Sequence, residues 1–115
     1  MELRIKIQNM EIPVEWENHS AVNTIIQKLS SVLRIQMSKK GTEQIGPFNI
    51  TVPRNDRSII AQPGDIAIRG GNQLVLFAAE DDVSVTKLGH IKNYSETQIK
   101  NLLSPSSMQL EFFEK

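Results

Sequence analysis

The residues with the clearest chemical potential lie in the segment GDIAIRGGNQLVLFAA, which begins at Gly64 and ends at Ala79. Its centre, Gly70-Gly71-Asn72, could cradle a phosphate, reverse the chain, or form the rim of a binding groove. A phosphate-binding loop leads into the amino terminus of a helix. Here the following residues, QLVLFAA, are apolar at nearly every position and indicate a strand covered on both faces. Because glycine and asparagine reach positive φ angles readily, we interpret the three residues as a tight turn between strands.

Side chains that support metal binding or nucleophilic catalysis do not occur in the required patterns. The chain has no cysteine, so disulfides, thiolate metal sites and a cysteine nucleophile are excluded. His19 and His90 are far apart in sequence and lack ligand spacing, and we expect surface or hydrogen-bonded histidines. Glu80-Asp81-Asp82 lacks the alternating ligands and central glycine of a calcium loop, and no serine lies in a nucleophile elbow. We therefore expect no cofactor and no metal.

Some basic residues lie beside predicted turns. Lys39 and Lys40 precede Gly41, and Arg69 stands at the lip of the turn before Gly70. Each could contact an anionic ligand, but basic side chains in such places are usually solvated. We expect Lys39 and Lys40 to be surface residues, and the sequence leaves the role of Arg69 open.

Length and charge limit the partners. A chain of 115 residues suits one domain, so we expect a single domain over residues 1–115. The 13 basic and 13 acidic residues offer no general attraction to nucleic acid or anionic lipid. The start, MELRIKIQ, lacks the apolar run of a secretory signal, and no later run approaches membrane-spanning length. We expect a cytoplasmic protein without nucleic-acid or membrane partners, whose oligomeric state the sequence leaves open.

The elements that would position these residues are mostly strands. Residues 3–7 and 12–16 alternate apolar and polar side chains, which predicts a hairpin that turns at Asn9-Met10. Pro13 suggests an unpaired edge, because proline cannot donate to a strand ladder. Further strands are predicted over 32–38, 65–69, 73–79 and 108–115, with shorter extended pieces over 39–56.

Two short helices complete the prediction. Apolar residues recur at helical spacing over 21–29 behind Ser20, which can cap the first turn with its hydroxyl. Ser95 and Gln98 have the spacing of a capping box, with Tyr94 and Ile99 placed as a hydrophobic staple. The sequence therefore predicts a mainly β protein with two short helices, and the pattern allows either a barrel or a sandwich.

This order of elements, with PGDIAIRGGNQLVLFAAEDD followed by TKLGHIKN and a short helix, resembles the small and largely uncharacterised cyclophilin-like proteins of bacteria and archaea. The resemblance covers almost the whole chain, and its most specific parts are PGDIAI, GNQLVLF and LGHI. It implies a closed β-barrel of about eight strands with a helix over each open end.

Classical cyclophilins are peptidyl-prolyl cis/trans isomerases, and the resemblance implies where a groove would lie. Gln73 matches the glutamine of their Gly-Ser-Gln-Phe-Phe segment, and their groove phenylalanine would become Val75. Their motif of catalytic arginine followed by Phe, Met and Gln would fall near residues 32–38. Arg34, Gln36 and Met37 are the candidates there, at spacings that cannot all be aligned. The groove Trp and His have no counterpart in EDDVSVTKLG.

Catalysis of prolyl isomerisation weakens the amide resonance and holds the proline in an apolar pocket. In classical cyclophilins an arginine does the first and an aromatic floor does the second. This sequence preserves at most part of each feature. We therefore predict a binding module that takes up a peptide segment or small ligand, with prolyl isomerase as the alternative. Self-association through the edge at Pro13 is a third possibility. The predicted groove residues are Arg34, in the tentative catalytic role, and Gln36, Met37, Gln73 and Val75 for binding.

Overall fold

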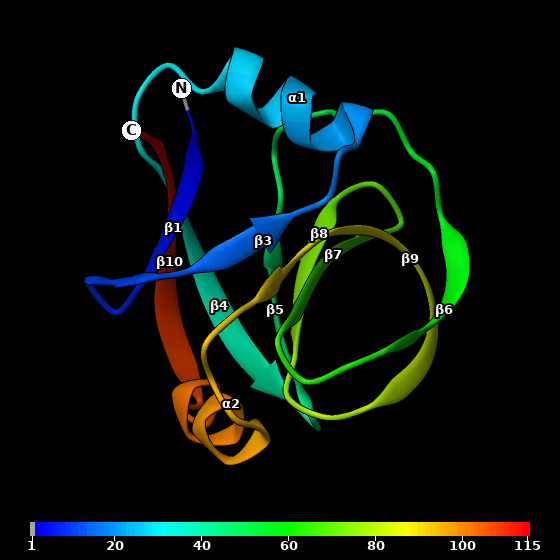
Figure 1. Cartoon of the computed structure of the whole chain (residues 1–115). Coiled ribbons are helices and arrows are strands. Elements are labelled where there is room, and N and C mark those ends of the chain that lie inside the picture. Colours follow the sequence, from blue (N-terminus) through cyan, green and yellow to red (C-terminus); the bar gives the residue numbers. More distant parts are fainter. Residues whose placement is uncertain (1) are drawn as a thin grey trace.

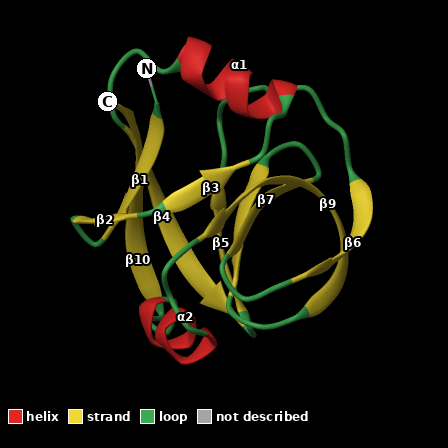
Figure 2. Cartoon of the chain, viewed as in Figure 1, coloured by secondary structure: helices red, strands yellow, loops and turns green. Residues whose placement is uncertain are grey.

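Ten strands and two helices make up residues 2–115, the part of the chain that the computed structural model describes (Figure 1, Figure 2). In chain order they are β1 (Leu3–Ile7), β2 (Met10–Ile12), β3 (Val14–Trp16), α1 (Ser20–Lys28), β4 (Leu33–Lys40), β5 (Glu43–Pro47), β6 (Arg57–Ala61), β7 (Asp65–Arg69), β8 (Gln73–Phe77), β9 (Asp81–Ile91), α2 (Glu96–Leu102) and β10 (Ser107–Glu114).

The strands form one antiparallel sheet that curls into a nearly closed barrel. Its order is β2-β1-β10-β4-β5-β8-β7-β9-β3, with β6 paired to β9. The two terminal strands of this order, β2 and β3, follow each other in the chain with Pro13 between them. Proline has no N–H for the ladder, so β2 stays with β1 while β3 crosses to β9. The barrel predicted from the resemblance is confirmed, and the chain itself joins its two edges at Pro13.

Positive φ angles mark the turns, of which the first lies at Gln8-Asn9, one residue before the predicted Asn9-Met10, because Ile7 pairs with Met10. Gln8 and Asn9, between β1 and β2, have φ angles of 52° and 68°, which suit a hairpin turn. Gly70 and Gly71, between β7 and β8, have φ angles of 63° and 80°. The segment around Gly70-Gly71-Asn72 is therefore the predicted turn between two strands, and no helix follows it.

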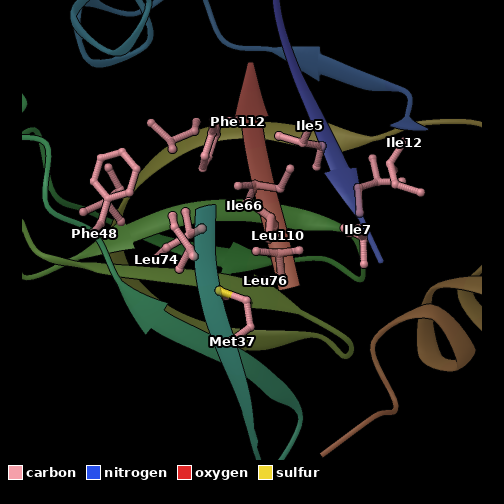
Figure 3. Packing of buried hydrophobic residues seen from close by; sticks show 14 of the residues in the cluster. Ile5, Ile7, Ile12, Met37, Phe48, Ile66, Leu74, Leu76, Leu110 and Phe112 are labelled. Carbon is pink, nitrogen blue, oxygen red and sulfur yellow. The ribbon is translucent and has the colours of Figure 1, made fainter. Parts of the chain in front are cut away.

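The barrel interior is filled by apolar side chains from alternate strand positions. Figure 3 shows this packing, in which Phe48 lies edge-on to Phe112 with ring centroids 5.8 Å apart. Burial of each such side chain contributes roughly 1.5–3 kcal/mol. The labelled members in Figure 3 are Ile5, Ile7, Ile12, Met37, Phe48, Ile66, Leu74, Leu76, Leu110 and Phe112.

A second, smaller core lies on the outer face of β7 and β8. The first part of β9 leaves β7 and pairs with β6, and this two-stranded flap covers the outer face. The flap explains why β8 is apolar on both faces, as predicted. Its strand β6, at the right edge of Figure 1, was not predicted as a strand. The buried members are Ala61, Ala67, Val75, Phe77 and Val85.

The helices cover opposite ends of the barrel (Figure 1). The N-cap of α1 is His19, not the predicted Ser20: the Nδ1 atom of His19 accepts a hydrogen bond from the Ala21 amide at 2.9 Å. Ser20 instead takes the first helical position. The capping box of Ser95 and Gln98 at the start of α2 is confirmed. Within residues 2–115, neither helix combines the length and apolar character of a transmembrane span.

Candidate functional site

An open groove of about 450 Å³ lies on the outer wall of the barrel, where β4 and β5 diverge. These strands pair at residues 38–40 and 43–45. If the register continued, Pro47 would lie opposite Gln36. Because Pro47 has no N–H to donate, the ladder ends before it, and the gap between the two strands forms the groove. The lining residues are Gln36, Ser38, Lys40, Ile45, Gly46, Pro47, Asn72 and Gln73.

A fixed amide stands at one side of the groove. Nη1 of Arg69 donates to Oε1 of Gln73 at 3.1 Å, which orients the Gln73 side chain. The same guanidinium donates to both carboxylate oxygens of Glu43 at 3.1 and 2.5 Å, and this bidentate pair raises the pKa of Arg69. Within residues 2–115, Nε2 of Gln73 makes no hydrogen bond. Gln73 thus presents an oriented N–H donor to the groove.

The floor of the groove is partly bare backbone. A Cβ atom on Gly46 would lie 2.6 Å from Sδ of Met37, 2.8 Å from Cγ2 of Ile35 and 2.9 Å from the backbone oxygen of Gln36. The barrel core therefore presses directly against Gly46 from the inside. Met37 is 0% exposed and belongs to that core, so it is beneath the groove and does not line it.

Val75 is also outside the groove. It is 0% exposed and packs in the second core beneath the flap of β6 and β9. Its cross-strand neighbour Ile45 shares its face of the sheet and does line the groove. With Pro47, Ile45 supplies the apolar part of the floor, a role that the sequence assigned to Val75.

Arg34 is turned away from the groove. Its side chain is 62% exposed, and its Nε atom lies 3.5 Å from Oε1 of Glu111, the residue opposite it on β10. Since β10 and β5 flank β4 on opposite sides, this ion pair draws the guanidinium away from Gln73. Of the predicted residues, the structure brings together Gln36 and Gln73 in one groove, and it leaves Arg34, Met37 and Val75 elsewhere.

The sequence reasoning missed most of the lining. The groove could have been predicted from Pro47, because proline ends a strand ladder and Gly46 before it allows close backbone approach. Lys40 was expected to be a solvated surface residue; it is exposed and lines the groove. Asn72 was predicted as a turn residue only. Its carbonyl accepts a hydrogen bond from the Phe48 amide at 2.8 Å, which connects the turn to the chain after β5.

A cluster of charged side chains lies apart from the groove. The buried carboxylate of Asp65 accepts from Nδ1 of His90 at 2.6 Å and from the Gln62 amide at 2.9 Å, with Nζ of Lys87 at 3.5 Å. These contacts fix the turn that precedes β7. Among residues 2–115, no three His, Cys, Asp or Glu side chains are gathered as metal ligands would be.

The chain resembles known proteins over nearly all of its length. A family model described as the cyclophilin-like family matches residues 5–112. The fold is similar to the solution structure of a hypothetical protein from Archaeoglobus fulgidus, with a TM-score of 0.68 and 18% sequence identity. That match covers 98% of this chain and 93% of the archaeal one, and at such identity it concerns the fold. None of the curated proteins matches this chain.

Proposed function

Because the chain belongs to the cyclophilin-like family, we propose that it is a binding module whose barrel-wall groove takes up a peptide segment or a small ligand. The observation that carries this proposal is the meeting of Gln36 and Gln73 across one open groove with an apolar floor. Amide side chains donate and accept hydrogen bonds, as peptide groups require. A groove of about 450 Å³ also falls within the usual range for small-ligand sites.

The groove supports binding better than prolyl isomerisation. An isomerase needs a cation near the proline nitrogen and an apolar wall for its ring. Arg34 is engaged by Glu111 on the far side of β4. Among the described residues, those that line the groove include no aromatic side chain. We therefore rank peptidyl-prolyl isomerase as the second candidate, and the test below separates it from binding.

The test is NMR titration of the labelled protein with a panel of X-Pro peptides and small metabolites, together with exchange spectroscopy on the peptides. Binding in the groove should shift the amide signals of Gln36, Ser38, Asn72 and Gln73. Gln36→Ala should weaken binding about 3- to 10-fold, as expected for one lost hydrogen bond. The exposed Gln27, on α1, gives the matched control Gln27→Ala, which should bind normally.

Ser38→Trp should abolish binding, because an exposed side chain of that size fills the groove without entering the core. Signal shifts that lie elsewhere and survive in Ser38→Trp would contradict the proposed site, and no shifts at millimolar ligand would contradict the proposed peptide and metabolite ligands. Accelerated cis/trans exchange of the peptides that disappears in Arg34→Ala would replace the binding module with an isomerase.

A further inference from the structure

The flap strand β6 has a free edge. Within residues 2–115 it pairs with β9 and with no other strand. In an antiparallel ladder, alternate residues turn their N–H and C=O groups away from the partner, so no strand covers the outer side of β6, where the side-chain amide of Gln62 donates to the Ile60 carbonyl at 3.4 Å. Such edges are normally protected by lysine, proline, a bulge or a covering segment. The sequence RSIIA of β6 contains neither lysine nor proline.

Among residues 2–115, the same strand carries the most exposed large apolar side chain. Ile60 is 62% exposed, compared with 50% for Met10 on β2 and 39% for Val32. The other free edge with an exposed apolar residue, β2, has three residues and is followed at once by Pro13. Its central residue, Glu11, is held by Arg4 at 2.6 Å. A partner that adds a strand therefore finds a longer and less obstructed edge at β6.

The charges at the two ends of the flap indicate what that partner is. Arg57 begins β6, after Asp56, whose charge is matched by Arg54 at 2.6 Å, whereas Ala61 at its end lies opposite Asp81 on β9, and Ile60 lies opposite Asp82. The flap is thus basic at one end and acidic at the other. An antiparallel second copy would set each basic end beside the other's acidic end, and a parallel one would set like charges together. The flap is complementary to itself under a two-fold axis.

We infer that two copies of this chain associate through antiparallel pairing of their β6 edges, which joins the two flaps into one four-stranded sheet. The register that centres the axis on Ile59 places Arg57 opposite the partner's Ala61. Arg57, Ala61 and Asp81 then follow one another across the strands on one face. At about 4.8 Å between strands, Arg57 and the partner's Asp81 lie about 10 Å apart at their Cα atoms, and their charges attract at the end of the sheet without contact across Ala61, which is 0% exposed in the second core.

The same register accounts for the exposed isoleucine. Ile60 then faces the partner's Ser58 and lies diagonal to the partner's Ile60, at the 7–8 Å typical of diagonal neighbours. The exposed Ile60 side chains of the two copies thereby shield each other. Because five-residue strands form a small interface, we expect a dimer that dissociates at tens to hundreds of micromolar, below the strength of standard interfaces.

The test is sedimentation equilibrium of the full chain from about 20 µM to 1 mM, at low ionic strength. The mass should rise from monomer to dimer and no further. Ile60→Lys should weaken association at least tenfold, because a charge on an edge strand opposes pairing. Met10→Lys is the matched control, since it removes an exposed apolar side chain from a different edge, and it should associate like the wild type.

A charge exchange tests the orientation. Arg57→Glu alone and Asp81→Lys alone should each weaken association, because both ends of each homodimer then carry like charges. An equimolar mixture of the two variants should recover association, because every end then pairs opposite charges. Asp81 also lies near Arg69, which keeps its bidentate pair with Glu43. Damage to that region would not be repaired by mixing, so recovery is specific to the interface.

A wild-type mass that stays monomeric to 1 mM would overturn the inference, as would association that Ile60→Lys leaves intact. A mixture no stronger than its components would overturn the antiparallel arrangement, and growth beyond the dimer would overturn the two-fold closure.

Discussion

Replacing Gln44 with methionine should loosen the barrel end that α2 covers. Gln44 is 0% exposed, and its Nε2 group donates to the carbonyl oxygens of Leu103 at 2.9 Å and Pro105 at 2.6 Å. The carbonyl of Leu103, the C-cap of α2, has no intrahelical donor, and the Pro105 carbonyl lies beyond the helix, so this side chain satisfies groups that the helix cannot. Methionine has a similar length and no donor, and both carbonyls would lose their partner.

The size of the effect follows from three polar atoms. Leaving a buried acceptor unpaired costs about 1–3 kcal/mol, so the buried Leu103 carbonyl and the part-buried Pro105 carbonyl together give roughly 2–5 kcal/mol. The Oε1 atom of Gln44 is itself buried without a partner among the described residues, and methionine removes that penalty of about 1–3 kcal/mol. The net loss in the free energy of unfolding should be about 1–3 kcal/mol. Urea unfolding followed by the fluorescence of Trp16 measures it.

A second substitution separates hydrogen bonding from packing. Gln44→Glu keeps the shape but, when ionised, presents acceptors alone to two carbonyls, so it should be less stable than Gln44→Met at pH 7. Protonation restores a donor, and the variant should regain stability as the pH falls toward the unfolded carboxyl pKa of about 4.3. If Gln44→Met is as stable as the wild type, or Gln44→Glu shows no such recovery, the assignment of these two hydrogen bonds is refuted.

Two further predictions concern other positions. Gly46→Ala should lose about 3 kcal/mol of stability, because its Cβ would meet a backbone oxygen at 2.9 Å as well as core side chains. The control Gly41→Ala, at φ +59° in open space, should lose about 1 kcal/mol, and the reverse order of their urea midpoints would contradict this account. Hydrogen bonds from the Thr86 hydroxyl and from Arg54 lower the pKa of Asp56. The stability advantage of the wild type over Asp56→Asn should be constant above about pH 4 and shrink as the pH falls further, and an advantage independent of pH would count against it.

The parts of the fold that follow from local rules were predictable. The positive φ angle of Asn9, the capping box at Ser95, and the covered faces of β8 were all expected from residue type and spacing. Each depends on interactions within a few residues of the chain or on the two-residue period of a strand. The overall barrel came from the family resemblance, because alternation alone is equally compatible with a sandwich.

The site was less predictable because it depends on which face of each strand looks outward and on what covers that face. Strand alternation put Gln36 and Met37 on opposite faces, so both could not line one groove. Val75 does lie on an outer face, but the unpredicted strand β6 and its partner β9 cover it. The direction of Arg34 is set by Glu111, 77 positions away, through the register of β4 with β10. Such long-range pairing has no local signature.

Interrupted ladders account for both special features of the barrel wall. At Pro13 the missing N–H interrupts one extended segment, so that β2 and β3 lie at opposite edges of the sheet. The chain between them thereby closes the barrel. At Pro47 the missing N–H ends the pairing of β5 with β4 while β5 remains paired to β8, and the gap becomes the groove. The polar groups exposed at such a gap are those that a neighbouring strand would otherwise cover. An extended peptide would replace that strand, which is the physical reason to place a peptide first among the ligands tested.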